Sequence, residues 1–386
     1  MRYKRRRHMA ATILTAAALA LTTTPAIAHP DTAPTSATAD PITSELAQLT
    51  ENYLQQRANM LTTTASITRS ARIATTRQMS AQVDADLTAL AEKGRRYEQV
   101  DGGYTKATVD VEVTNASVGE SAATLQVSEY TRLHLPFTPQ EMEEGAPEYE
   151  EIALPHTVQF ARTAEGTWLL ASDVAETDGG PAPSTQVERA DPAPADEGGS
   201  PDEDEGTKTP PSETTVLPDT GVTVVKPASY SYGKIAAYAD KYWKNNNKAY
   251  RTYSNDCTNF ISQAMLAGGW GPKGGALIQR TSNKYWFYGP TTFTTSYTWA
   301  GAENWYWFAQ KHSKRTKMLT NVWNLVASDV LQADWDKNGN IDHTMMVTKR
   351  YQGTPYLTYH SGATHNKSLA KLLSDHKKTW WYAHRT

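Results

Sequence analysis

The sequence contains very little cysteine: Cys257 is the only one among 386 residues. A single thiol cannot form an intramolecular disulfide, so the chain is not a disulfide-stapled scaffold. Paired cysteines and His-x-x-x-His spacings, which are common ligand patterns for zinc, are also missing. We therefore expect neither zinc nor any other cofactor. Cys257 is a buried inert residue, an intermolecular linker or a nucleophile.

Long apolar runs are scarce as well. The apolar run at residues 9–21 is shorter than the ~20 residues that a membrane-spanning helix needs. It follows five basic residues within positions 2–7 and precedes Ala26-Ile27-Ala28, which is typical of a signal-peptide cleavage site. We predict that residues 1–28 are a signal peptide. The mature protein would then be secreted, without a membrane span, and either free outside the cell or associated with the cell wall.

The composition changes at residues 177–227. This segment is rich in Pro, Gly, Ser, Thr and acidic residues, and it has almost no large apolar side chains. Such a segment cannot bury enough surface to offset its ordering entropy, so we predict an acidic disordered linker. Its pentapeptide LPDTG at 217–221 matches a wall-sorting signal, but a whole domain follows it, and we interpret the match as coincidental.

Charge divides at the same place. Residues 228–386 carry 20 Lys or Arg against 8 Asp or Glu, whereas residues 1–227 carry 18 against 33. A basic domain implies acidic partners, which for an exported protein are anionic wall polymers or acidic peptides rather than nucleic acid. A solvated surface that balances the acidic linker is the alternative.

Residues 41–176 show two patterns in succession. Apolar residues recur at helical spacing from 44 to about 99, which predicts two or so amphipathic helices. Strand-like alternation follows, for example at Val109, Val111 and Val113. Helices followed by an antiparallel sheet make an α+β domain. The stretch 156–173 resembles the final hairpin of the cone-shaped fold shared with nuclear transport factor two, which implies an accessory domain of that kind.

The stretch YSNDCTNFISQAMLAGGW at 253–270 surrounds the single thiol. Polar capping residues precede Cys257, apolar residues follow at helical spacing, and two glycines end the pattern. Cys257 should therefore lie in the first turn of a helix. Free N–H groups and the helix dipole favour an anion there, which would lower the pKa of the thiol.

A nucleophilic thiolate needs a base and a residue that orients the base. Downstream we predict a strand at 330–333, a polar turn at 336–340, and a second strand in which His343, Met345 and Val347 share one face. A third strand ends at His360, with a polar loop and a helix behind it. A cysteine at a helix start, followed by a sheet that presents histidines, is the papain-type arrangement.

Three blocks carry a closer resemblance: NDCTNFISQAMLAGG, DWDKNGNIDHTMMVT and YLTYHSGATHNKSL. In this order they resemble the putative amidase domain family of secreted bacterial proteins, which is distantly similar to the NlpC-type cell-wall peptidases. The resemblance covers the chain from Tyr230 to the end, within a domain predicted at 228–386, and implies a papain-like amide hydrolase. It implies that Cys257 is the nucleophile, His343 the base and His360 the orienting residue.

The mechanism implied is acyl transfer to sulfur. His343 would hold Cys257 as a thiolate, and the N–H of Cys257 would stabilise the oxyanion, with Asn255 or Asp256 shaping the oxyanion hole. We expect a secreted thiol amidase or peptidase that acts on peptidoglycan or peptides. The alternatives are an acyltransferase or transglutaminase-like enzyme, which normally uses Asp as its third residue, and a wall-binding module with a vestigial Cys-His site.

The segment DWDKNGNID also matches the first nine positions of a calcium-binding loop. The oxygen ligands would come from Asp334, Asp336, Asn338, Asn340 and Asp342. The twelfth position, which should supply a bidentate Glu, is a methionine. We therefore favour a tight hairpin turn, with weak structural calcium binding as the alternative.

Overall fold

The computed structural model describes residues 40–64, 73–177, 180–187, 205–216, 226 and 229–386. The predicted signal peptide and the LPDTG pentapeptide lie outside the described residues. Residues 40–386 form one compact unit. Within the described part of the chain, no helix is long and apolar enough to cross a membrane.

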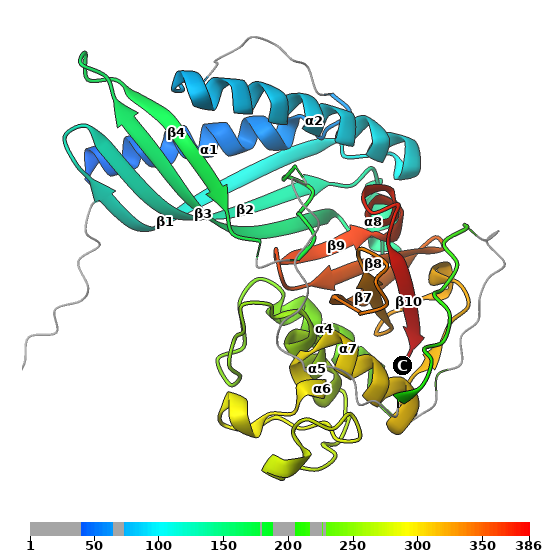
Figure 1. Ribbon diagram of the computed structural model, residues 1–386. Helices are drawn as coiled ribbons and strands as arrows, with labels where there is room; N and C mark the ends of the chain where they lie inside the picture. The colour runs from blue at the N-terminus through cyan, green and yellow to red at the C-terminus, as the bar shows by residue number, and fades with distance from the viewer. Residues whose placement is uncertain (1–39, 65–72, 178–179, 188–204, 217–225, 227–228) are drawn as a thin grey trace, which may run out of the picture. The chain divides into compact units, whose positions relative to one another are not determined.

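Helices come first in the N-terminal region, and strands follow (Figure 1). The elements are α1 (Pro41–Asn59), α2 (Arg77–Asp101), β1 (Lys106–Val118), β2 (Ala122–His134), α3 (Pro139–Glu143), β3 (Tyr149–Arg162) and β4 (Trp168–Ala175). Thr76 caps the start of α2, and Gly102 ends it in the left-handed conformation with φ 83°. Both helices pack their apolar faces on the sheet around Leu90 and Leu125. The predicted helices and strands are therefore present in the predicted order.

The C-terminal region begins with helices and ends with strands. Its helices are α4 (Tyr232–Tyr242), α5 (Cys257–Ala267), α6 (Tyr297–Ala300), α7 (Ala302–Tyr306) and α8 (Leu369–Asp375), with short helical turns η2 (Leu277–Gln279), η3 (Thr292–Thr294), η4 (Trp307–His312) and η5 (Val322–Asn324). Its strands are β5 (Lys317–Met318), β6 (Val330–Asp334), β7 (His343–Tyr351), β8 (Thr354–Tyr359), β9 (Thr364–Ser368) and β10 (Trp380–Arg385). The sequence analysis placed only a polar loop where β9 lies.

One antiparallel sheet joins the two regions. Its order is β1-β2-β3-β9-β8-β7-β6-β10-β5, and β4 also pairs with β3. The connection is made by β3 and β9, where Glu151 pairs with His365 and Ile152 with Thr364. Mixed helices and antiparallel strands confirm the α+β class. The two predicted domains share this sheet, and their division into separately folding units stays a prediction.

Strand β7 separates two apolar cores, because successive side chains point to opposite faces of a sheet. On one face Met346 belongs to a core with Phe260 and Ile261 of α5. On the other face Met345 and Val347 belong to a core that includes residues of α8. Residues 257–265 of α5 are all buried, so this helix is enclosed by the C-terminal region. The tryptophans at 270, 286, 299 and 305 are fully buried in the same region, as expected for a compact aromatic core.

A buried ionic cluster around Asp375 fastens α2 to α8. The Asp375 carboxylate accepts hydrogen bonds from Lys367 Nζ (2.8 Å), Tyr97 Oη (2.5 Å) and Arg96 Nη2 (2.7 Å). Burial alone would raise the pKa of Asp375, but the ammonium groups of Lys367 and Lys93 hold that pKa well below its ordinary value. Helix α2 is thus tied to α8 by ionic contacts that are buried and that little water can replace.

The described parts of the predicted linker pack against the rest of the chain. Ser184 and Thr185 are buried, and Ser184 Oγ donates to Glu150 Oε1 at 2.5 Å. Further on, the N–H of Ser212 donates to the carbonyl oxygen of Trp381 at 2.7 Å. The first of these parts also buries Pro181, Ala182 and Pro183, so hydrogen bonds and small apolar residues order it together. Large apolar side chains are scarce in it, which is why its composition predicts disorder. Residues 188–204 and 217–225 lie outside the described residues.

We predict that Asp375→Asn lowers the free energy of unfolding by about 3 kcal/mol near pH 7, because it leaves buried Lys367 without its counter-charge. Urea unfolding followed by circular dichroism measures this. The folded-state pKa of Asp375 is lowered, so its contribution is present above the ordinary Asp pKa of about 4 and is lost as the pH falls. The unfolding free energies of the variant and the wild type should converge in acid.

Glu92→Gln, in an exposed pair with Arg95, is the control and should change stability by less than about 0.5 kcal/mol. Equal stability of Asp375→Asn and wild type at pH 7 would contradict a stabilising role for the ionic cluster around Asp375.

Candidate active site

Cys257 is the first residue of α5, and its side chain is fully buried. Its Sγ atom lies 3.6 Å from Thr258 Oγ1. Burial raises the pKa of Cys257 to about 11, although hydrogen bonds from Thr258 and from the backbone of Thr344 oppose this shift. The expectation of a lowered pKa is wrong for this conformation, because the loss of hydration outweighs the favourable field of the first helical turn.

His360 follows β8 directly and is held against the start of α5. Its Nδ1 atom lies 2.8 Å from Asp256 Oδ2, and its Nε2 atom lies 3.0 Å from the backbone oxygen of Tyr242. The ring stacks on Phe260 with 3.9 Å between the centroids. Both neighbours are oxygen acceptors, so both contacts are hydrogen bonds only when both ring nitrogens carry protons. The partner of His360 is therefore a carboxylate on the residue next to the thiol.

Asn255 and Asp256 position this histidine. Asp256 Oδ1 accepts hydrogen bonds from the N–H of Tyr253 (2.9 Å) and from Asn259 Nδ2 (2.8 Å), which leaves Oδ2 for His360. Asn255 Oδ1 accepts from Ser361 Oγ at 3.1 Å. Ser361 has a φ of 68°, so the turn after the histidine is in the left-handed region and needs such support. The sequence analysis gave both residues an oxyanion role, which stays a prediction, and it missed the carboxylate–histidine pair.

His343 lies on the opposite face of the sheet from α5. Thr344 Oγ1 lies 2.9 Å from a threonine hydroxyl of α5, so the preceding side chain points the other way. The ring of His343 packs instead near Trp335 and Tyr359, at centroid distances of 5.8 and 5.6 Å. His343, Met345 and Val347 do share one face, as predicted, but that face looks away from Cys257.

The environment of His343 does not suit a base in this conformation. Both of its ring nitrogens lack a hydrogen-bond partner among the described residues. Burial, with a contribution from His376, lowers the pKa of His343 to about 3, so the ring is neutral near pH 7. The structure therefore does not pair His343 with Cys257. The role of His343 as the base stays a prediction, and it requires a rearrangement of the start of β7.

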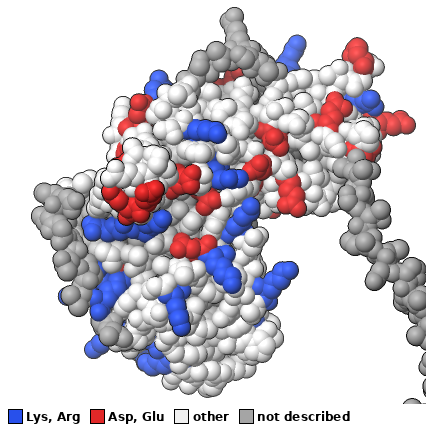
Figure 2. Space-filling model, turned by 180° about the vertical axis from the view of Figure 1, so that it is seen from behind, with Lys and Arg blue, Asp and Glu red and all other residues white. Residues whose placement is uncertain are grey.

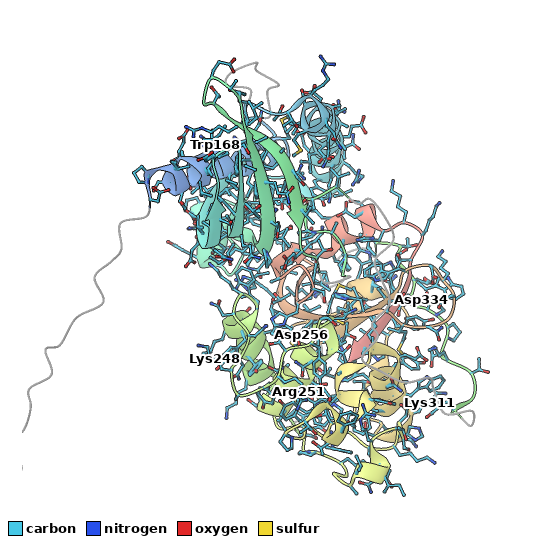
Figure 3. All side chains as sticks on the ribbon, turned by 60° about the vertical axis from the view of Figure 1, so that its left-hand side comes forward. Trp168, Lys248, Arg251, Asp256, Lys311 and Asp334 are labelled. Atoms are coloured by element: carbon cyan, nitrogen blue, oxygen red, sulfur yellow. The ribbon has the colours of Figure 1, made fainter. Side chains whose placement is uncertain are left out.

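A cavity of about 380 Å³ adjoins the Asp256–His360 pair. Figure 3 shows Asp256 in the middle of the molecule, between the N-terminal sheet and the helices of the C-terminal region. One wall comes from β1, β2 and β3, including Tyr130, and another from the segment after α4, including Trp243 and Lys244. The Lys244 ammonium lies 3.5 Å from the centre of the Tyr130 ring. No sequence motif could reveal this cavity, because its walls come from segments more than a hundred residues apart.

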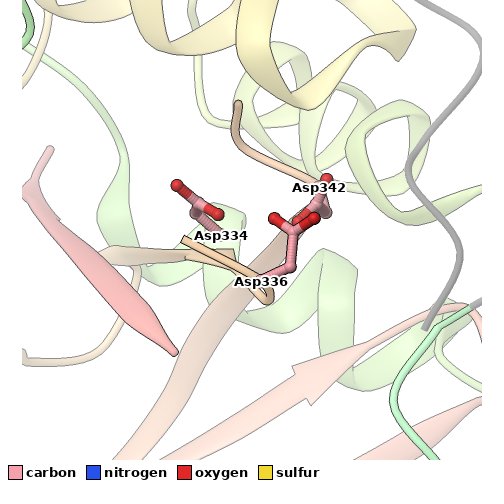
Figure 4. Close-up of side chains that lie close together, drawn as sticks. All are labelled: Asp334, Asp336 and Asp342. Atoms are coloured by element: carbon pink, nitrogen blue, oxygen red, sulfur yellow. The ribbon is translucent and has the colours of Figure 1, made fainter. Parts of the chain in front are cut away.

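The predicted calcium loop forms a tight turn with three carboxylates close together (Figure 4). One oxygen from each of Asp334, Asp336 and Asp342 lies within 4.8 Å of the others. Two of these carboxylates also accept hydrogen bonds from the turn itself: the N–H of Gly339 donates to Asp334 Oδ2 at 2.9 Å, and the N–H of Asn338 donates to Asp336 Oδ1 at 3.1 Å. These bonds favour the hairpin-turn interpretation. Asp334 lies apart from Asp256 (Figure 3), so the loop is not part of the candidate active site.

The turn generates a prediction about Asp342. Burial raises the pKa of Asp342 to about 6. The nearby charge of Asp334 adds to this shift, and the hydrogen bond from the N–H of Trp335 opposes it. The raised pKa means that the stability contributed by the neutral carboxyl is present below pH ~4 and is lost as the pH rises through 6. Asp342→Asn should therefore raise the melting temperature at pH 7.5 in EDTA and have little effect near pH 4.

We expect millimolar CaCl₂ to leave the wild-type melting temperature unchanged. A calcium-dependent increase that the variant lacks would establish calcium binding instead.

A second prediction concerns the thiol. In the folded protein Cys257 should react with iodoacetamide at pH 7.5 at least about 100-fold more slowly than in urea, because the thiol is buried and largely protonated. Mass spectrometry of timed samples measures the rate, which should rise as the pH approaches 11. Complete labelling of the folded protein at the rate seen in urea would contradict the described burial.

The C-terminal region is similar to a known protein family. Residues 229–384 match the family model described as a putative amidase domain. Two Bacillus subtilis (strain 168) proteins are similar: the uncharacterized protein YhbB, 29% identical over 127 residues, and the uncharacterized protein YjcM, 31% identical over 140 residues. These alignments cover 32% and 34% of this chain, but only 40% and 31% of the two relatives.

A solved structure is also similar in part. The crystal structure of a conserved protein from Planctomyces limnophilus DSM 3776 aligns with 35% of this chain and 98% of its own, at 15% identity and a TM-score of 0.19. The family match rests on the same segment that holds α5, β7 and the histidine after β8. Residues 229–384 are thus similar to the putative amidase domain family.

Proposed function

We propose that the chain is a cysteine-dependent amide hydrolase in which Cys257 is the nucleophile and His360, oriented by Asp256, transfers the protons. The contact of 2.8 Å between His360 Nδ1 and Asp256 Oδ2 carries this proposal. A carboxylate on Nδ1 fixes the orientation of an imidazole and stabilises its protonated form, which is its function in catalytic triads. The match of residues 229–384 to the putative amidase domain family supports the reaction type.

The proposed reaction is acyl transfer to sulfur. His360 Nε2 leaves the carbonyl of Tyr242 and passes its proton to water, so that the neutral ring can accept the Sγ proton of Cys257. The thiolate then adds to the amide carbonyl carbon. No side chain caps the N-terminus of α5, so N–H groups of its first turn remain for the oxyanion. The imidazolium then donates its proton to the leaving amine as the C–N bond breaks. Water, deprotonated by His360, adds to the thioester, and the acid product and the thiol are released.

The described conformation requires an opening step before this chemistry. The thiol is fully buried, and Nε2 of His360 is engaged with Tyr242. Tyr242 ends α4, and the next residues, Trp243 and Lys244, line the cavity. Substrate that enters the cavity would contact this segment and could release both groups together. We therefore assign the described form to a resting state.

His343 is the competing candidate for the base. Its place in the DWDKNGNIDHTMMVT block supports that role through the resemblance, with His360 then orienting it. To act on Cys257, its ring would have to leave the core beside Trp335 and cross to the other face of β7. The two assignments make different predictions for single substitutions, which allows one experiment to decide between them.

The substrate and location are also part of the proposal. The signal-peptide pattern at 1–28 supports secretion, and the excess of Lys and Arg in residues 228–386 supports attachment to anionic wall polymers. Peptidoglycan or peptide amides are then the accessible substrates. We further propose that the C-terminal region is papain-like, with its cysteine helix packed on an antiparallel sheet. The N-terminal helices and sheet would be a cone-shaped accessory domain of the nuclear transport factor two type.

The burial of Cys257 favours a second candidate function. A fully buried thiol with a pKa of about 11 is also the expected state of an inert cysteine. The chain would then be a wall-binding module whose basic surface carries its function. This candidate predicts binding to cell walls that does not depend on Cys257, His360 or His343, and no hydrolysis.

The proposal predicts a specific order of activities on purified peptidoglycan and on soluble peptide amides. Cys257→Ala should abolish hydrolysis, His360→Ala should lower kcat by at least about 10³-fold, and His343→Ala should lower it by less than about tenfold. Asp256→Asn should lower kcat more than it raises KM and should shift the pH profile, because it acts through His360. Product release is measured by mass spectrometry, and circular dichroism checks folding.

His134→Ala, in the N-terminal sheet, is the matched histidine control and should retain wild-type activity. A large loss in His343→Ala with little loss in His360→Ala would transfer the base role to His343. No hydrolysis by the wild type, together with undiminished wall binding by Cys257→Ala, would contradict the enzyme proposal and favour the binding module.

A further inference from the structure

Three large apolar side chains protrude from two neighbouring loops of the C-terminal region. Leu277 and Ile278 in η2 are 64% and 90% exposed, and Phe293 in η3 is 73% exposed. We call these three residues the loop-tip patch. They include the two most exposed large apolar side chains among the described residues. Such clustering of exposed apolar groups is unusual for a surface that meets only water.

The two loops are fixed to each other and to the core. Arg280 connects them, because its Nε donates to the carbonyl oxygen of Thr292 at 3.1 Å and its own carbonyl accepts from the N–H of Tyr297 at 3.0 Å. The first loop is anchored at its base by paired backbone hydrogen bonds of 2.8 Å between Lys273 and the fully buried Trp286. The patch is therefore held in place by the scaffold rather than exposed by a loose loop.

The charged residues of the two loops have one sign, and the nearly buried Glu205 contacts the first loop only through Asn283 Nδ2, at 3.1 Å. Residues 257–302 contain no Asp or Glu, whereas Lys273, Arg280 and Lys284 lie on the two loops. None of these three cations forms an ion pair with a described residue. In the face shown in Figure 2, the lowest part of the molecule carries blue side chains and no red ones. Apolar tips beside cations that form no ion pair with a described residue match a surface that is apolar inside and anionic outside.

We propose that the loop-tip patch is a peripheral binding site for an anionic lipid surface. Ile278 and Phe293 would enter the boundary between headgroups and acyl chains, and Lys273 and Lys284 would contact the anionic headgroups. A second copy of the chain is disfavoured as the occupant, because two patches would bring six cations together with no acid between them. A soluble anionic wall polymer would satisfy the cations but would offer no apolar phase to the tips. The site is separate from the candidate active site and does not rest on the proposed reaction.

Vesicle cosedimentation tests this proposal with residues 40–386, the compact unit, so that the apolar run at 9–21 cannot contribute. The wild type should bind vesicles of phosphatidylcholine with about 30% phosphatidylglycerol and should bind pure phosphatidylcholine at least about tenfold more weakly. The double variant Ile278→Ser, Phe293→Ser should bind the anionic vesicles at least about tenfold more weakly than wild type, because it removes most of the inserted apolar area.

The basic rim is tested by Lys273→Gln, Lys284→Gln, which should weaken binding at low salt and make it less sensitive to added NaCl. Val174→Ser is the matched control, since Val174 is 57% exposed on β4, away from the patch. This control should bind like the wild type. Circular dichroism and the melting temperature check that each variant is folded.

Three results would overturn the proposal. The first is vesicle binding that the Ser double variant retains in full, which would show charge attraction alone. The second is a wild type that binds no vesicles but dimerises with increasing concentration in sedimentation velocity, while the Ser double variant stays monomeric. This result would identify a second copy of the chain as the occupant. The third is binding to isolated anionic wall polymer with no binding to vesicles.

Discussion

The packing of α5 against one face of the sheet limits the chemistry that Cys257 can perform. Side chains of β7 and β8 alternate between that face and the opposite one, so each histidine is assigned to one side. His360 lies on the α5 side, beside Asp256, and His343 lies on the other side, beside Trp335. Moving either residue across the sheet would require a change of register or the melting of a strand end. The account of catalysis therefore depends first on this alternation.

Burial is the second constraint on the site. A thiol without access to water is protected from oxidation, but it is also unreactive until something opens the site. The cavity beside His360 indicates where an opening ligand would enter. Because one wall belongs to β1, β2 and β3, the N-terminal region would take part in substrate access. The shared sheet and the Asp375 cluster hold that wall in a fixed relation to the site.

The sequence predicted much of the local structure for clear physical reasons. The capping residues and apolar spacing around Cys257 gave the start of α5, and alternation gave β6, β7 and the end of β8. Alternation also placed His343, Met345 and Val347 on one face, but it could not tell which face would meet the cysteine helix, because both faces are buried. The Asp256–His360 pair joins residues about a hundred positions apart, so no local pattern could show it. The described parts of the linker were missed because hydrogen bonds and small buried residues such as Pro181 and Ala182 hold them, rather than large apolar side chains.

The central claim is that Cys257 forms a covalent acyl intermediate with an amide substrate. Intact-mass and peptide mass spectrometry of protein quenched in acid within milliseconds of mixing with a soluble peptide amide tests this directly. The account predicts a mass increase equal to the acyl part of the substrate, confined to the peptide that contains Cys257 and absent from Cys257→Ala. It also predicts that the adduct decays as the acid product appears. Steady product formation with no adduct on Cys257 at any quench time, or with an equal rate in Cys257→Ala, would contradict the account.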